Sequence, residues 1–226
     1  MSEKYYINEL YPLQDKVLDL IGKLNTSFYL SGGTALSRVY LNHRYSDDLD
    51  FFQNDSDTFR KDAENIIREI KKSGIGELET ALTDDSFVRL FLNRNDVILK
   101  IEMINDVAFH EDGFISDKIF NKVDSWKNIL SNKISAISRN EPKDMADILF
   151  LCEAFTFNWM DAIESAKKKD IWVNEIELSR IFNNYPVQSM KDLKWINTPN
   201  YENLSEKLKE IAKTILLAED NKQEST

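Results

Sequence analysis

The sequence predicts an α+β protein: a domain with a mixed sheet flanked by helices at residues 1–116, followed by a helical bundle domain at residues 117–226. Short apolar runs that end at turn residues dominate the first half, and apolar residues at helical spacing dominate the second. The charge changes near the same place. Residues 1–117 carry 13 basic and 22 acidic residues, or −9, whereas residues 118–194 carry 12 and 11, or +1. A chain of 226 residues can bury a core in each part.

The first half begins with a predicted helix at 8–24, where leucine, valine and isoleucine recur at helical spacing. Asp57 is the expected N-cap of an amphipathic helix at 57–72, and Ser73-Gly74 is its expected end. The polar run NRND predicts a hairpin turn at 93–96. The other expected elements are strands at 28–30, 48–52, 77–83, 86–93 and 96–104 and a short helix at 34–41.

The second half is expected to be helical throughout. Pro142 stands near the start of one expected helix, where proline is tolerated. Cys152 lies in the apolar run ILFLC and is expected to be a buried thiol rather than a nucleophile. The tail at 219–226 is expected to fray. The expected helices are 125–139, 141–155, 158–168, 174–183 and 202–219.

Several classes of protein are disfavoured. No apolar run approaches the ~18–20 residues of a membrane span, and the first residues lack the apolar core of a signal peptide. With a single cysteine no intramolecular disulfide can form, so we expect a cytoplasmic protein. An acidic chain is a poor generic nucleic-acid binder, but carboxylates suit a site that binds phosphates through a divalent metal.

A glycine pair and an acid cluster stand close together. Gly32-Gly33 follows a predicted strand and precedes a predicted helix, a junction that offers backbone N–H groups to an anion. Asp48 and Asp50 flank Leu49, so on a strand both carboxylates project to one face. Such a pair repels itself unless a cation lies between its members. Either element alone is weak evidence for a function, and SDDLD could be a solvated loop. Together, the two elements favour a metal–triphosphate site.

A third acid stands on a later predicted strand. The strand period of NDVILKIEMI puts Lys100 and Glu102 on one face. They could be exposed on the wet face of an edge strand, or Glu102 could complete the acid set. The upstream elements favour the second interpretation.

Four segments together resemble the AbiEii/AbiGii nucleotidyltransferase toxin family, within the polymerase-β-like nucleotidyltransferase superfamily. They are SGGTAL at 31–36, HRYSDDLDFF at 43–52, ILKIEMI at 98–104 and KISAISRNEPKDMADILFL at 133–151. The superfamily shares the first two segments, and the fourth is the specific one. In the fourth, helical spacing puts Lys143, Asp144 and Asp147 on one face. That face could be solvated with ordinary ion pairs, or it could belong to the active site, as the resemblance favours.

The resemblance implies a polymerase-β-like domain that uses an NTP and Mg²⁺ or Mn²⁺, with a helix of the second domain contributing to its site. It implies that Lys100 contacts the nucleotide phosphates and that Asp144 or Asp147 acts in or beside the site. The catalytic set is then Asp48, Asp50, Glu102, Lys100 and Asp147, of which Asp48, Asp50 and Glu102 hold metal. The nucleotide-binding set is Ser31, Gly32, Gly33, Thr34, Arg44, Ser46, Arg139, Lys143 and Asp144.

The expected activity is transfer of an NMP from an NTP to a hydroxyl acceptor. The resemblance implies an RNA acceptor such as the tRNA 3′ end, and a toxin of a toxin–antitoxin or phage-defence (abortive infection) pair with a separately encoded antitoxin. RNA would approach the near-neutral segment, through Lys122, Lys127, Lys133 and Lys167–Lys169. One alternative is a nucleotidyltransferase that acts on a small molecule or a protein. Another is a non-catalytic interaction module on the same fold.

Overall fold

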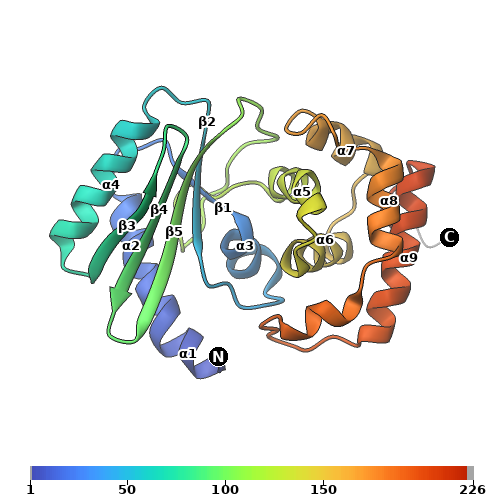
Figure 1. The fold of residues 1–226 in the computed structure, drawn as a ribbon, viewed down its shortest axis with the longest axis horizontal. Helices are drawn as coiled ribbons and strands as arrows, with labels where there is room; N and C mark the ends of the chain where they lie inside the picture. The colour runs from blue at the N-terminus through green and yellow to red at the C-terminus, as the bar shows by residue number, and fades with distance from the viewer. Residues whose placement is uncertain (1, 223–226) are drawn as a thin grey trace. The chain divides into compact units, whose positions relative to one another are not determined.

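The computed structural model describes residues 2–222. The chain divides into two compact units, the first ending at Ser125 and the second beginning at Trp126 (Figure 1). This division lies after the boundary at residue 116 that the charge pattern predicts, because residues 122–124 pair with the first strand. Leu30 N donates to Lys122 O at 2.9 Å, and Asp124 N donates to Leu30 O at 2.9 Å. Among the described residues, no helix has both the length and the apolar character of a membrane span.

The first unit is a sheet with helices. Residues 3–22 form one continuous helical segment, and residues 32–41 form a second that follows the first strand directly. The strands are β1 (Tyr29–Ser31), β2 (Leu49–Asn54), β3 (Glu77–Thr83), β4 (Phe87–Arg94) and β5 (Val97–Asp106). The helices are α1 (Glu3–Tyr5), η1 (Tyr6–Leu10), α2 (Tyr11–Gly22), α3 (Gly32–Ala35), η2 (Leu36–Leu41) and α4 (Phe59–Ser73).

The five strands form one mixed sheet in the order β1-β2-β5-β4-β3. β2 and β5 are parallel, whereas the other neighbouring strands are antiparallel. The chain leaves β2 through α4 and the β3–β4 hairpin, and then returns beside β2 as β5. Residues 52 positions apart therefore become neighbours: Asp50 stands opposite Glu102.

One face of the sheet is buried and the other carries polar groups. Leu90, Leu99 and Ile101 are fully buried, and α2 and α4 lie together on one side of the sheet (Figure 1). The alternate positions Lys100 and Glu102 are only partly buried. The period of two expected for a half-buried strand is thus observed.

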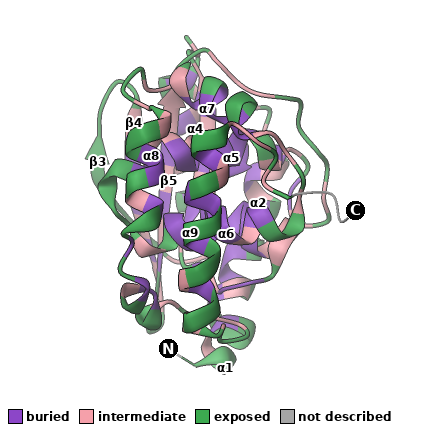
Figure 2. Cartoon of the chain, turned by 90° about the vertical axis from the view of Figure 1, so that its right-hand side faces the viewer, coloured by how far each residue is buried: buried purple, intermediate pink, exposed green. Residues whose placement is uncertain are grey.

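The second unit is helical. Its elements are α5 (Trp126–Ser135), η3 (Ile137–Arg139), α6 (Pro142–Ala154), α7 (Trp159–Lys167), α8 (Glu175–Asn183), η4 (Val187–Asp192) and α9 (Tyr201–Leu217). Asparagine side chains cap α7, α8 and α9 by accepting from backbone N–H groups in the first turn, as N-caps do. Figure 2 shows the exposed and buried stripes of α9, whose apolar residues Leu204, Leu208 and Ile215 face the core.

The predicted fold class is confirmed, with a mixed sheet followed by helices. Two details differ. Thr58, not Asp57, occupies the N-cap position of α4, while Gly74 ends the helix in the left-handed region as expected. The expected fraying is wrong for the first half of the tail, because Asn221 donates to Cys152 O and Phe155 O, both at 2.8 Å. Residues 223–226 lie outside the described residues.

Candidate active site

The Gly32-Gly33 turn lies directly against Asp50. β1 and β2 pair so that Ser31 stands opposite Asp50, and Gly32 has a φ of +67°. A Cβ on Gly32 would collide with Asp50 Oδ2 and lie 3.1 Å from Asp50 Cβ. Both the left-handed backbone and the close approach therefore require glycine here.

The second glycine makes room for two predicted site residues. A Cβ on Gly33 would lie 2.7 Å from Arg44 Nη2 and 3.1 Å from Ser46 Oγ. Arg44 and Ser46 are both buried, and Arg44 Nη1 donates to Tyr45 O at 3.1 Å. The structure thus brings Gly33, Arg44 and Ser46 together, although ten residues separate the turn from the arginine.

The acid pair stands at the start of β2. Leu49, the first residue of the strand, is fully buried, and its neighbours Asp48 and Asp50 remain partly accessible. Thr34 Oγ1 donates to the backbone oxygen of Asp48. That bond ties the helical segment after the turn to the start of β2.

Lys100 links the acids of the two parallel strands. Its Nζ lies 2.8 Å from Asp48 Oδ2 and 3.4 Å from Glu102 Oε2. Partial burial lowers the pKa of Lys100, but the hydrogen bond to Asp48 and the charges of Asp48, Glu102 and Asp50 outweigh burial, so the pKa of this ammonium is raised overall. The side chain is therefore a fixed cation within the acid set.

Glu102 has a partner that the sequence did not indicate. Arg89 Nε donates to Glu102 Oε1 at 2.7 Å, because β4 and β5 pair with these two residues opposite each other. Among the described residues, no three His, Cys, Asp or Glu side chains are arranged to share a metal ion. Carboxylate oxygens are the donors that Mg²⁺ and Mn²⁺ prefer, so Asp48 and Asp50 still fit a metal by chemistry. The role of Glu102 is considered below.

Ser31 is engaged inside the protein. Its Oγ donates to Asp124 Oδ2 at 2.6 Å, and His110 Nε2 lies 2.9 Å from Asp124 Oδ1. Asp124 is fully buried. It lies 93 residues from Ser31 with no periodic signal around it, so only the pairing of β1 with residues 122–124 reveals it. The Ser31 side chain thus fixes the turn, and the place of Ser31 in the nucleotide-binding set stays a prediction.

In the second unit, the two aspartates of α6 share a buried lysine. Lys133 Nζ lies 2.6 Å from Asp144 Oδ1 and 2.9 Å from Asp147 Oδ2, and all three residues are buried. Of the two interpretations of this helix face, ordinary ion pairs in solvent are therefore wrong for the aspartates. Lys143 and Arg139, by contrast, are exposed. The contribution of this helix to the site of the first unit stays a prediction.

Most lysines expected to receive RNA are already engaged. Lys133 is buried between its aspartates. Lys167 pairs with Glu164 at 3.0 Å and Glu175 at 2.8 Å. Lys169 donates to Asn128 Oδ1 at 2.6 Å. Lys167 and Lys169 thus already have partners within the protein, and the predicted role of Lys167–Lys169 as RNA phosphate contacts stays a prediction.

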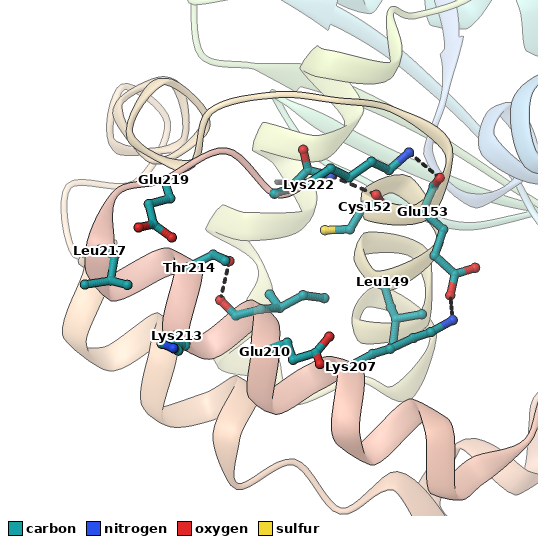
Figure 3. Close-up of a pocket in the computed structure, with 12 residues that line it drawn as sticks. Leu149, Cys152, Glu153, Lys207, Glu210, Lys213, Thr214, Leu217, Glu219 and Lys222 are labelled. Atoms are coloured by element: carbon teal, nitrogen blue, oxygen red, sulfur yellow. Dashed lines mark hydrogen bonds and ion pairs between the residues drawn. The ribbon is translucent and has the colours of Figure 1, made fainter. Parts of the chain in front are cut away.

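The second unit also contains a cavity of about 670 Å³ between α6, α9 and the segment that follows α9 (Figure 3). Cys152 lines it, and burial strongly raises the pKa of this thiol, as expected for an unreactive cysteine. Lys222 Nζ donates to Glu153 O at 2.6 Å, and Lys207 pairs with the Glu153 carboxylate. Three lysines and three glutamates line this cavity, so its charge does not favour a triphosphate.

A comparison with protein-family models shows which family this chain belongs to. The model of the family described as "Nucleotidyl transferase AbiEii toxin, Type IV TA system" matches residues 19–223. The chain belongs to this family. The resemblance to this family is confirmed. The family description names a nucleotidyltransferase that is the toxin of a type IV toxin–antitoxin system, and it implies an antitoxin as the partner.

Solved structures share the fold. JHP933 from Helicobacter pylori has a TM-score of 0.69 and 20% identity, covering 95% of this chain and 93% of that chain. A putative nucleotidyltransferase from H. pylori has a TM-score of 0.69 and 21% identity over 95% and 96%. MenT4, a nucleotidyltransferase toxin from Mycobacterium tuberculosis, has a TM-score of 0.58 and 12% identity over 92% and 82%. No curated protein sequence matches this chain.

Proposed function

We propose that this AbiEii-family protein transfers the NMP group of an NTP to a hydroxyl of RNA, such as the tRNA 3′ end, with Mg²⁺ or Mn²⁺. It acts in the cytoplasm as the toxin of a toxin–antitoxin or phage-defence pair, and a separately encoded antitoxin restrains it. One observation carries the proposal: the Gly32 turn and the Asp48/Asp50 pair meet where β1 ends and β2 begins, and Lys100 of the adjacent β5 contacts Asp48.

The groups at this place match the parts of the reaction. Asp48 and Asp50 would hold the divalent metal, which would supply activation of the acceptor oxygen and stabilisation of the leaving pyrophosphate. The backbone N–H groups of Gly32-Gly33 approach the phosphates without side chains in the way. Lys100 and Arg44 neutralise charge that develops on the phosphates.

The second unit supplies the remaining groups in this proposal. Arg139 and Lys143 are exposed cations, so both are accessible to the phosphates of a nucleotide that enters from solvent. The buried Lys133–Asp144–Asp147 cluster holds the N-terminal part of α6 in place. A charge cluster of this kind is expensive to bury, so its presence supports a functional role for this end of α6.

The test uses NTPs labelled on the α-phosphate, since only that phosphate is retained on the acceptor. Each of the four NTPs is incubated with total RNA and either the wild-type protein or Asp48→Asn. We expect one or more NTPs to label RNA, metal to be required, and the variant to be inactive. A γ-labelled NTP is the control, because an acceptor labelled from it would indicate phosphate transfer instead.

A small-molecule or protein acceptor is the second candidate, and the −9 charge of residues 1–117 favours it over RNA. The same experiment separates the two, since a label would then appear in a small molecule or a protein and not in RNA. If the wild type labels no RNA, protein or small-molecule fraction with any NTP, transferase activity itself is refuted.

A further inference from the structure

Glu102 lies between two cations. Arg89 Nε and Nη2 both lie 2.7 Å from Glu102 Oε1, and Lys100 Nζ lies 3.4 Å from Glu102 Oε2. Each carboxylate oxygen thus faces a positive group. The Glu102 side chain is 15% exposed, so these contacts are only partly screened by solvent.

The sheet register produces this arrangement. β5 places Glu102 opposite Asp50 on one side and opposite Arg89 on the other. Two carboxylates side by side on neighbouring strands repel each other, and Arg89 supplies the compensating charge. The guanidinium also lies over the Phe87 ring, at 5.2 Å from its centre, which restricts its orientation.

We propose that Arg89 is a positioning residue that holds Glu102 as the counter-ion of Lys100, so that Glu102 orients Lys100 and is not a third metal ligand. This inference rests on the proposed function and deepens it. For Glu102 to bind metal through Oε1, that oxygen would have to give up its two-pronged contact with Arg89 Nε and Nη2, which is charge-assisted and therefore stronger than a neutral hydrogen bond.

Lys100 needs such an anchor when metal is bound. Its closest partner is Asp48, at 2.8 Å, and a divalent cation on that carboxylate repels the ammonium. Glu102, two residues along the same strand, offers Lys100 a second anion outside the metal ligands. Asp48 and Asp50 are then available to metal, while Lys100 is available to the phosphates.

The test combines single and double variants on the full chain. Arg89→Gln removes the charge, Arg89→Lys keeps it without the two-pronged geometry, and Glu102→Gln removes the counter-ion. Arg94→Gln is the matched control, because Arg94 lies on the same strand and donates to Ile75 O at 3.0 Å. Three properties are measured: transfer kinetics, NTP affinity by calorimetry, and Mn²⁺ affinity by electron paramagnetic resonance. A thermal scan establishes that each variant is folded.

We expect Arg89→Gln to lower kcat/KM about tenfold, the usual effect of losing a partner that orients a site residue. Arg89→Lys should restore part of this loss, and Arg94→Gln should behave as wild type. In the Glu102→Gln background, Arg89→Gln should have no further effect. Mn²⁺ affinity should change by less than about twofold in Glu102→Gln, because both Glu102 oxygens face Arg89 and Lys100 in place of the metal.

Two results would overturn the inference. Tenfold weaker Mn²⁺ binding by Glu102→Gln would make Glu102 a ligand, and additive losses in the double variant would mean that Arg89 acts through another group. If the wild type binds NTP but transfers nothing, the proposed function fails, and the double-variant comparison of NTP affinity still tests the positioning role. A wild type that binds neither Mn²⁺ nor NTP would overturn both.

Discussion

Gly32 offers a sharp test of the site, because an alanine there would meet two separate obstacles. The φ of +67° places the residue in the left-handed region, which costs an L-residue about 1–2 kcal/mol. Reduced freedom of the unfolded chain offsets roughly 0.4–1 kcal/mol of this. The new Cβ also collides with the Asp50 carboxylate, and forcing that side chain away from its rotamer costs roughly 0.5–1.5 kcal/mol.

Other glycines separate the two effects. Gly74 has nearly the same φ, +65°, but nothing lies within 4 Å of its Cβ position. Gly74→Ala should therefore cost about 1 kcal/mol from strain alone, and Gly32→Ala about 2 kcal/mol. Gly113 has open space around its Cβ position, so Gly113→Ala is the baseline.

Activity should separate these variants more strongly than stability does. A displacement of about 1 Å at a reacting centre can cost roughly 100-fold in rate, so Gly32→Ala should lose about that much transfer activity. Gly74→Ala should keep wild-type kcat. Thermal scans and α-phosphate labelling measure both quantities. Equal thermal shifts for Gly32→Ala and Gly74→Ala, together with wild-type kcat in Gly32→Ala, would refute the placement of Asp50 against the turn.

Three further outcomes are expected. Asp48→Asn should abolish transfer and change the free energy of unfolding by less than about 1 kcal/mol, since its ion pair is partly exposed; a much larger loss in chemical denaturation would make Asp48 structural. The pKa of Lys100 is raised above its ordinary 10.5, so its ion pair stabilises the protein below about pH 10.5 and is lost as the pH rises through the folded-state pKa. The stability difference between wild type and Lys100→Met should accordingly shrink above that pH, and a constant difference up to pH 11.5 would contradict the raised pKa. Lys133→Met should lower the free energy of unfolding by roughly 3–5 kcal/mol, because it leaves Asp144 and Asp147 buried without their cation. Adding Asp144→Asn to the same chain should recover part of this stability in denaturation curves. If the double variant recovers none, the loss is not purely electrostatic.

Local patterns in the sequence predicted the elements of the fold well. The period of two in 97–104 and the amphipathic period of 57–72 each reflect one buried face, which short-range spacing records. Gly74 and the 93–96 turn were also readable, because left-handed backbone positions favour glycine and asparagine; Asn95 has a φ of 54°.

The partners of the site residues were harder to predict, because they depend on pairing between distant segments. Arg89 meets Glu102 only through the register of β4 on β5. Asp124 meets Ser31 across 93 residues. Lys133 lies inside the family motif, but the sequence predicts an accessible lysine there, since a lone lysine is usually on the surface. Two aspartates at i and i+3 on the next helix were the signal that could have identified its partners.

The parallel pairing of β2 with β5 also determines when, during synthesis, a working site can exist. Asp48 and Asp50 leave the ribosome some 50 residues before Lys100 and Glu102, and a parallel pair cannot close until the intervening crossover is complete. Arg89 is already present on the hairpin when Glu102 emerges. A nascent chain that ends within the β3–β4 hairpin therefore carries the acid pair without its cation. For a toxin of this family, this order means that a chain truncated before β5 carries the acid pair but lacks Lys100 and Glu102, so the proposed site cannot form.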